Sequence, residues 1–529
     1  MKPGAGRFSL RRRWLLLTLA LLLAALSVAA LHGRWCYRVS GEEAALPCWR
    51  GFAQWLFNWT RPLPHTEDDR LVAYTDVPPF GINLFLEQEA DPAVRERTVR
   101  AASEAGFHWV RQEFPWEDIE IHGKGDFEDR RHVPYRSAWE KYDEIVALTE
   151  RYGMELIARL SNPPAWSRAA GDANGTYAPP DDFDDYGDFV AAVAERYRGR
   201  IRFYQIWNEP NIYPEWGKQP VDPEAYTALL CLAYRRIKAV DPQAVIITGA
   251  LAPTDQLGTP IAEGGNNLMD TLFLQRMYDA GAADCFDILA VNDYMLRSGP
   301  TDRRLRPQLM NFSRPLWVRD VMVANGDGAK PIWITEMNSN AVPEGMPAPY
   351  GRVSEAQQAR YAVEAFERIQ REWPWVGVAN VWFLRRPSEQ ERDQPWYYFR
   401  LMEPDFTPLP VYTALQHYIT TLEPVLYRGR HAADTWQIAY GEGWSSEGDA
   451  MRGVEGAELT LRWEGRSLRF EGIGTEPVRL CLREDDGPSR TIVVEGPTLL
   501  VHRSLFAAQH TLHLTVVEGT WLFKVVDVH

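Results

Sequence analysis

Short apolar runs alternate with longer amphipathic stretches along the chain from about Val77 to Leu422. The runs are rich in Ile, Val, Trp and Phe, which is typical of buried parallel strands, and the stretches carry apolar residues at helical spacing. Eight such strand–helix pairs predict an α/β fold whose parallel sheet closes into a (β/α)8 TIM barrel. The predicted strands are 81–85, 107–111, 155–160, 202–207, 244–249, 286–291, 331–334 and 377–383, and the predicted helices are 93–105, 138–152, 182–197, 223–240, 267–280, 314–325, 355–373 and 411–422.

The pattern changes at about Tyr427, where short β-rich segments begin and the turns contain Gly, Asp or Pro. These segments predict a C-terminal β-sandwich module, which suits either carbohydrate binding or bracing of the barrel. The predicted strands of this module are 457–463, 467–470, 478–482, 491–494 and 511–517. The expected parts of the chain are an N-terminal membrane anchor or signal segment (1–31), a lead-in or stalk (32–76), the barrel (77–425) and the β-sandwich accessory module (426–529).

The N-terminus carries a signal for membrane insertion or export. Arg11-Arg12-Arg13 precedes the eighteen residues 14–31, which only Thr18 and Ser27 interrupt as mildly polar residues. This length lies between that of a membrane-spanning helix and that of a long signal-peptide core. Basic residues before an apolar run favour a cytoplasmic N-terminus. We expect a transmembrane anchor with the rest of the chain outside the cytoplasm, or a secreted protein if the segment is cleaved.

Charge and cysteine content narrow the possible partners. The formal net charge is −15, with no long basic run outside the extreme N-terminus, which argues against nucleic acid as a partner. Cys36 and Cys48 lie close enough in sequence to pair in an oxidising compartment, and we expect Cys231, Cys285 and Cys481 to be buried thiols. No metal-ligand spacing occurs among the cysteines, and the oligomeric state is left open.

Two glutamates stand at the ends of predicted strands. Glu209 lies within 207–211 (Trp-Asn-Glu-Pro-Asn) after the fourth strand, and Glu336 lies within 333–338 (Trp-Ile-Thr-Glu-Met-Asn) after the seventh. The carboxyl ends of the strands meet at one face of a TIM barrel, where its chemistry takes place. A pair of carboxylates there suits cleavage of a glycosidic bond, because one donates a proton and the other attacks the sugar. This chemistry needs neither a metal nor an organic cofactor.

Further polar and aromatic residues follow the same predicted strands. Asn208 can reach a sugar hydroxyl, and Arg111 and Tyr294 are placed to donate hydrogen bonds to Glu336. Trp382, at the end of the eighth strand, can form an apolar floor under a sugar ring. The predicted substrate-binding residues are Asn208, Arg111, Tyr294, Trp382, Asn83 and Trp166.

With these motifs the chain resembles the clan A glycoside hydrolases, and it is most similar to glycoside hydrolase family 39 and its cellulase-like relatives. The resemblance covers roughly residues 78–420. It implies hydrolysis with net retention of anomeric configuration, with Glu209 as acid/base and Glu336 as nucleophile. Together with the N-terminal segment, it leads us to expect a retaining glycosidase that cleaves β-linked O-glycosidic bonds in an extracellular oligo- or polysaccharide. One departure occurs at Asn292, because such enzymes often carry a histidine two positions before the tyrosine. This departure leaves the sugar open.

Several alternatives remain open at this point. The scaffold also suits a transglycosylase, or a non-catalytic glycan-binding protein of the cell envelope. Arg111 has a structural alternative, an ion pair with Glu113 or Glu117. We expect Glu87, Glu113 and Glu117 to be bystanders, and Arg385-Arg386 to lie in a solvated loop rather than bind an acidic sugar. The insertions expected to set the sugar, the linkage and endo or exo action are 169–185, 254–267 and 339–352.

Overall fold

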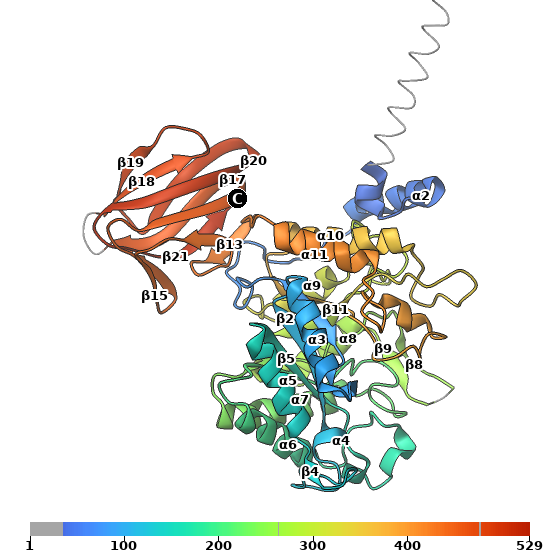
Figure 1. Cartoon of the computed structure of the whole chain (residues 1–529). Coiled ribbons are helices and arrows are strands. Elements are labelled where there is room, and N and C mark those ends of the chain that lie inside the picture. Colours follow the sequence, from blue (N-terminus) through green and yellow to red (C-terminus); the bar gives the residue numbers. More distant parts are fainter. Residues whose placement is uncertain (1–34, 263, 475–477) are drawn as a thin grey trace, which may run out of the picture.

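The computed structural model describes residues 35–262, 264–474 and 478–529 (Figure 1). A barrel of strands and helices makes up most of the molecule, and an antiparallel sheet from the C-terminal end of the chain lies beside it. The predicted anchor or signal segment, 1–31, lies outside the described residues. Within them, no helix combines the length and the apolarity that a bilayer crossing requires.

Eight parallel strands of the described chain form the predicted TIM barrel. In chain order they are β1 (Phe80–Leu84), β2 (Trp109–Pro115), β5 (Glu155–Ser161), β6 (Phe203–Ile206), β7 (Val245–Ile247), β10 (Leu289–Asn292), β11 (Ile332–Met337) and β12 (Val376–Val381). β1 pairs with β2 on one side and with β12 on the other, and β7 and β10 end the ladder of paired strands. The parallel bridges Ile247–Ile288 and Leu251–Val291 close the ring between those two strands.

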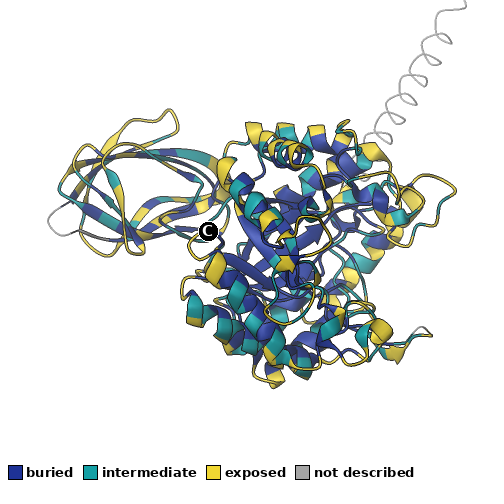
Figure 2. Cartoon of the chain, turned by 60° about the horizontal axis from the view of Figure 1, so that its bottom comes forward, coloured by how far each residue is buried: buried dark blue, intermediate teal, exposed yellow. Residues whose placement is uncertain are grey.

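Most helices surround the barrel strands and turn their buried faces toward them (Figure 2). Local signals start several of these helices: Asp91 accepts a hydrogen bond from the backbone N–H of Ala93, and Ser354 and Gln357 form a capping box. The helices are α2 (Ala45–Leu56), α3 (Pro92–Glu104), α4 (Trp116–Ile119), α5 (Glu140–Arg151), α6 (Phe183–Arg196), α7 (Pro223–Val240), α8 (Asp270–Asp279), α9 (Pro315–Ala324), α10 (Glu355–Glu372) and α11 (Pro410–Thr421).

Short helices and hairpins occur in the connections between the longer elements. The 3₁₀ helices are η1 (Phe57–Thr60), η2 (Leu86–Gln88), η3 (Ala165–Ser167), η4 (Gly171–Asn174), η5 (Ala282–Cys285) and η6 (Pro395–Phe399). The small hairpins are β3 (Glu128–Asp129) with β4 (Arg136–Ser137), and β8 (Leu257–Pro260) with β9 (Asn266–Leu268). The β8–β9 hairpin occupies the insertion predicted at 254–267.

Aromatic side chains fill the barrel interior near the strand starts. Trp109, Phe203 and Trp333 are buried, and their ring centroids lie 5.0–5.1 Å apart. Side chains two residues apart in a strand share one face, so Arg111 lies above Trp109 on the inner face of β2. The aromatic layer therefore forms a packed floor, and the carboxyl ends of the strands are left for polar residues.

The C-terminal region forms a nine-stranded antiparallel sheet within the described residues, and this sheet fits the predicted β-sandwich. The predicted strands 457–463 and 467–470 are parts of one long strand, because the chain stays paired through Gly465. Trp463, Phe470 and Trp521 lie in its separate hydrophobic core. The strands are β13 (Gly429–Ala432), β14 (Ile438–Tyr440), β15 (Trp444–Glu447), β16 (Ala450–Gly453), β17 (Glu458–Gly474), β18 (Val478–Glu484), β19 (Arg490–Val494), β20 (Thr498–Glu518) and β21 (Trp521–Val528).

Two disulfides link elements of the described chain. Cys36 and Cys48 are bonded, as their spacing predicted. Cys231 and Cys285 are also bonded, so the prediction of buried thiols at these two positions was wrong. The fold packs η5 against α7, which brings together two cysteines 54 residues apart in sequence. Cys481 is free.

The lead-in at 32–76 contains helical structure that the sequence did not predict. The helical parts are residues 35–40, α2 and η1. The Asn58 side chain holds this segment on the barrel: its Nδ2 donates to Arg303 O (2.8 Å), and its Oδ1 accepts from Leu305 N (3.0 Å). Farther along, Leu71 forms a β-bridge with Arg430 of the C-terminal sheet. The lead-in therefore contacts both parts of the molecule.

Candidate active site

Glu336 lies inside β11, because this strand ends at Met337, three residues beyond its predicted end at Ile334. The pairing of β10 with β11 shifts register after Val291, so that Asn292, and not Asp293, stands opposite Glu336. A bulge of this kind changes the direction of the side chains that follow it. Only 5% of Glu336 is exposed, and both of its carboxylate oxygens accept hydrogen bonds from other barrel residues.

Glu209 follows β6 in a turn with unusual backbone angles. Trp207 and Glu209 have φ angles of 75° and 33°, which residues other than glycine rarely adopt. Such strained positions concentrate at functional sites. The Trp207 indole is buried and donates to Glu215 O at 2.8 Å, so packing holds the turn in place.

Arg111 connects the carboxylate site to four neighbours. Its Nη1 donates to Glu336 Oε1 and to Asn83 Oδ1, each at 2.8 Å. Its Nη2 donates to Asn208 Oδ1 at 2.9 Å, and its Nε donates to Gln205 Oε1 at 2.7 Å. The guanidinium is only 3% exposed, and these bonds hold its plane in one orientation with its positive charge next to Glu336.

Tyr294 donates to the second carboxylate oxygen, Glu336 Oε2, at 2.6 Å. Burial and the negative charges of Glu336 and Glu209 raise the pKa of Tyr294 well above its ordinary value, so its hydroxyl stays a donor. The predicted partners of Glu336 are therefore both in contact with it. The alternative ion pairs of Arg111 with Glu113 or Glu117 do not occur among the described residues.

Asn292 connects Glu209 to Thr335, the residue before Glu336. Its Nδ2 donates to Glu209 Oε1 at 2.7 Å, and its Oδ1 accepts from the hydroxyl of Thr335 at 2.8 Å. Burial and then the negative charge of Glu336 raise the pKa of Glu209 to about 8, whereas the Asn292 bond and Arg111 lower it. Sequence reasoning noted Asn292 only as a departure from the usual histidine and missed its contact.

A second group of acidic residues adjoins the site, and the sequence prediction treated two of its members as bystanders. Arg159 pairs with Glu113 at 2.5 Å, and Ser161 donates to Glu113 at 3.0 Å. Burial raises the pKa of Glu215 to about 7, although Arg159 and a hydrogen bond from Asn208 lower it. Glu215 lies six residues beyond Glu209 in an irregular loop, so no periodic pattern could place it here.

Glu87 is the other acidic neighbour that the sequence prediction set aside. Its pKa rises to about 7, through burial first and then through the negative charge of Glu113. Gln112 donates to Glu87 Oε2 at 2.5 Å. Glu87 and Glu215 are thus each linked electrostatically to Glu113, and burial and the charge of Glu113 also raise the pKa of the more exposed Glu117.

Asn83 and Trp382, which were also predicted to bind substrate, lie in different surroundings. Asn83 is buried, accepts from Arg111, and donates to Thr335 O (2.9 Å) and Val381 O (3.2 Å), so it supports Arg111 from within the barrel. Trp382 is half-buried, follows a strand end and is joined to Phe383 by a cis peptide bond. Its ring lies 5.4 Å from that of Phe85.

Trp166 contacts the protein core rather than the carboxylates. Its ring packs edge-to-face on Trp116 at 5.4 Å, and its Nε1 donates to Glu120 O at 2.8 Å. Tyr350, which was not predicted individually, belongs to the insertion at 339–352. Burial and then the negative charge of Glu209 raise the pKa of Tyr350. The rings of Tyr294 and Tyr350 lie 5.2 and 5.8 Å from Phe399, which makes an aromatic wall beside the site.

The prediction of a solvated loop at Arg385-Arg386 was wrong. Arg385 is 3% exposed, forms an ion pair with Glu89, and donates to Pro404 O at 3.0 Å. Arg386 is half-buried over the Phe85 ring at 4.1 Å and pairs with Glu391 at 2.6 Å. The loop folds back onto the barrel, so these arginines are committed to structural contacts.

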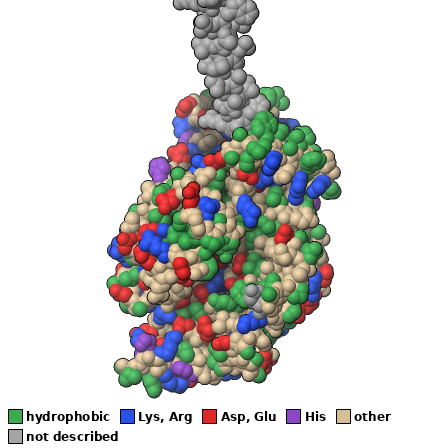
Figure 3. Space-filling model, turned by 90° about the vertical axis from the view of Figure 1, so that its right-hand side faces the viewer, with side chains coloured by type: hydrophobic (Ala, Val, Ile, Leu, Met, Phe, Trp, Pro, Cys, Tyr) green, Lys and Arg blue, Asp and Glu red, His purple; other side chains and the backbone are tan. Residues whose placement is uncertain are grey.

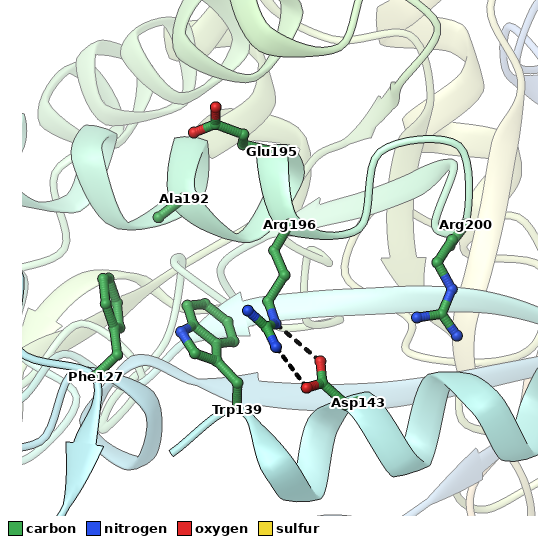
Figure 4. A pocket seen from close by; sticks show the side chains of 7 residues that line it. All are labelled: Phe127, Trp139, Asp143, Ala192, Glu195, Arg196 and Arg200. Carbon is green, nitrogen blue, oxygen red and sulfur yellow. Dashed lines mark hydrogen bonds and ion pairs between the residues drawn. The ribbon is translucent and has the colours of Figure 1, made fainter. Parts of the chain in front are cut away.

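The molecule is hollowed on the side where β8 and β9 lie, and Asp and Glu side chains lie in and around this hollow (Figure 3). The β8–β9 hairpin follows β7, so this is the side toward which the barrel strands end. Another pocket lies elsewhere, between α5 and α6, where Phe127 and Trp139 line it beside the Arg196–Asp143 ion pair (Figure 4). It contains none of the predicted site residues.

Comparison with known proteins yields structural neighbours only. No protein-family model matches the chain. No curated protein matches it either. Among solved structures it is similar to a family 39 glycoside hydrolase from the gut symbiont Bacteroides cellulosilyticus WH2, with 18% identity, a TM-score of 0.48, and coverage of 85% of this chain and 83% of that one.

Two further solved structures match a similar share of this chain. A monomeric β-xylosidase from Caulobacter crescentus CB15 shares 15% identity at a TM-score of 0.44, over 86% of this chain and 98% of that one. A glucosidase from Croceicoccus marinus shares 14% identity at a TM-score of 0.47, again over 86% and 98%. The chain is thus similar to glycoside hydrolases of the kind that its motifs resemble, at a level that assigns neither a family nor a substrate.

Proposed function

We propose that the chain is a retaining glycoside hydrolase that cleaves β-linked O-glycosidic bonds in an extracellular oligo- or polysaccharide. One observation carries the proposal. Glu336 is held by Arg111 and Tyr294, while burial and the charge of Glu336 raise the pKa of Glu209 to about 8. Two carboxyl groups in such different environments suit the roles of nucleophile and proton donor.

In the first step, Glu209 is protonated at neutral pH and gives its proton to the glycosidic oxygen. A Glu336 oxygen attacks the anomeric carbon as the bond to the leaving group breaks, which forms a glycosyl ester. Arg111 and Tyr294 orient Glu336 for this attack.

In the second step, Glu209 acts as a base. The ester removes the negative charge of Glu336, which is one of the causes of the raised pKa of Glu209. The pKa of Glu209 therefore falls after the first step, and its carboxylate can take a proton from water as the water attacks the anomeric carbon. Two displacements restore the original anomeric configuration, and Glu336 leaves as a carboxylate.

We also propose that the protein is attached to a membrane by residues 14–31 and that the barrel lies outside the cytoplasm. The three arginines before this apolar run support that orientation. The two disulfides support an oxidising compartment. For the C-terminal sheet we propose a bracing role, supported by the Leu71–Arg430 bridge.

The proposed activity is tested with the full chain in detergent, a panel of aryl β-glycosides, and plant and bacterial polysaccharides. Wild type and Glu336→Ala are assayed side by side. Turnover by wild type alone supports the proposal and identifies the sugar. Equal turnover by both proteins on an unactivated glycan would contradict it.

A further inference from the structure

A row of aromatic side chains lies on α2 and the elements next to it. The ring centroids of Trp35 and Phe52 lie 4.6 Å apart, those of Phe52 and Trp55 5.9 Å, and those of Trp55 and Trp59 5.4 Å. Trp49 joins the row through Phe52 at 6.1 Å. Trp35, Trp49 and Trp59 are 47%, 51% and 73% exposed. We refer to these five residues as the aromatic edge.

The opposite side of α2 is fixed to the molecule. Cys48 and Gly51 are buried, and the Cys36–Cys48 disulfide ties α2 to helical residues 35–40. A Cβ at Gly51 would lie 2.5 Å from Ser40 Cβ, so the two segments are in close contact. With Asn58 bonded to Arg303 and Leu305, the aromatic edge is held in a set position.

Charge is nearly absent from this segment. Arg50 is the single charged residue in the sequence 45–60, and Leu46, Leu56 and Phe57 are exposed there together with the aromatic edge. Soluble proteins rarely leave a contiguous apolar surface of this kind open to water, and such surfaces mark interaction sites.

The sequence just before this segment indicates what covers it. The apolar residues 14–31 end only four residues before Trp35, a span of at most about 14 Å. Tryptophan is enriched at membrane–water interfaces, and interfacial helices bury their apolar faces about 5–10 Å into the boundary. Arg38, Arg50 and Arg61 are exposed and form no ion pair with a described residue, which suits anionic headgroups.

We propose that the aromatic edge rests in the headgroup region of a lipid bilayer and holds the barrel against the membrane. This inference rests on the membrane attachment proposed above and is independent of glycosidase activity. In Figure 3, apolar side chains gather at the top of the molecule, at the height of α2 in Figure 1, and the hollow lies below them. The hollow would then open along the membrane surface, toward glycan that lies beside it.

The test uses the full chain in vesicles of phosphatidylcholine and phosphatidylglycerol. Trp59→Cys is labelled with an environment-sensitive NBD dye, in a background in which the free Cys481 is replaced by Ser. The matched control is Val133→Cys, whose position is 93% exposed. We expect the dye at position 59 to shift its emission to shorter wavelength and to be quenched at least about twofold by lipids with a shallow doxyl group. The dye at position 133 should show neither effect.

Three results would overturn the proposal. In the first, the chain fails to float with the vesicles. In the second, it floats but the dye at position 59 behaves like the dye at position 133. In the third, the dye at position 59 is shielded without doxyl quenching and crosslinks to a second copy of the chain. Turnover of a glycoside, measured on the same vesicles, reports separately on the proposed activity.

Discussion

The amide of Asn292 donates a 2.7 Å hydrogen bond to the carboxylate of Glu209. This bond stabilises the charged form of Glu209, and it opposes the burial and the Glu336 charge that raise the pKa of the same group. The position is the one where the sequence departs from the histidine of the enzymes it resembles. A neutral amide there does not titrate near neutral pH, so Glu209 and its other neighbours determine the alkaline limit of activity.

Asn292→Ala should therefore raise the pKa of Glu209 further and move the alkaline limb of kcat/KM to higher pH. We expect a displacement of about one pH unit, because a hydrogen bond to a charged group contributes about 1.5–3 kcal/mol and one pH unit corresponds to about 1.4 kcal/mol. The measurement is a pH profile on an aryl glycoside. Thr335→Val removes the other bond of Asn292 and is the control, with an alkaline limb close to wild type. A limb that moves to lower pH in Asn292→Ala would contradict this account.

Replacement of Glu209 by its neutral analogue should stabilise the fold at alkaline pH. The pKa of Glu209 is raised by folding, so its contribution to stability is fully present below the unfolded value of about 4.3 and is lost as pH rises through about 8. Glu209→Gln cannot lose a proton. Its Tm should exceed that of wild type by more at about pH 9 than at about pH 5.

The matched control for this comparison is Glu195→Gln, an exposed position on α6. Its difference in Tm from wild type should not grow with pH. If the Tm differences of Glu209→Gln and Glu195→Gln from wild type depend on pH in the same way, the raised pKa of Glu209 is not the cause of that dependence. Turnover by Glu209→Gln should fall most for substrates with poor leaving groups, because only these require a proton donor.

The Arg111–Glu336 ion pair should show strong coupling, because its side chains are 3% and 6% exposed. Arg111→Ala leaves a buried carboxylate without its cation, and we expect a loss of about 3–5 kcal/mol in the free energy of unfolding. Adding Glu336→Gln should recover much of that loss, which a double-mutant cycle in urea measures. Additive losses would show that the two residues do not interact.

The Cys231–Cys285 disulfide should contribute to stability in an oxidising buffer. Cys231→Ser with Cys285→Ser should lower the free energy of unfolding by about 2–4 kcal/mol, because the bond closes a long loop in the unfolded chain. Cys481→Ser, at the free cysteine, is the control and should change little. Equal behaviour of the two variants would contradict a bonded pair.

The barrel was predictable because its signals are local and repeated. Apolar runs such as the one before Glu209 and a helix such as Pro223–Val240 lie where their periodicity placed them. The Arg111–Glu336 and Tyr294–Glu336 contacts were also predictable, since the carboxyl ends of parallel strands must meet.

Features that depend on loops and on distant packing were not predictable. Glu215 reaches the site through an irregular turn, and Arg385 is buried because its loop folds back onto Glu89. The Cys231–Cys285 bond depends on how η5 packs on α7, which no spacing in the sequence encodes. Trp166 follows a barrel strand, as predicted, but its ring packs against Trp116, a contact that the sequence did not predict.

The most direct test of the proposed mechanism is the product that Glu336→Ala forms from an activated aryl β-glycoside in the presence of azide. The variant should be nearly inactive alone, because it lacks the carboxylate that attacks the sugar. Azide should restore turnover by entering the space of the missing side chain, and NMR should show a glycosyl azide of inverted configuration. A glycosyl azide of retained configuration, or wild-type turnover without azide, would contradict the assignment of Glu336 as the nucleophile.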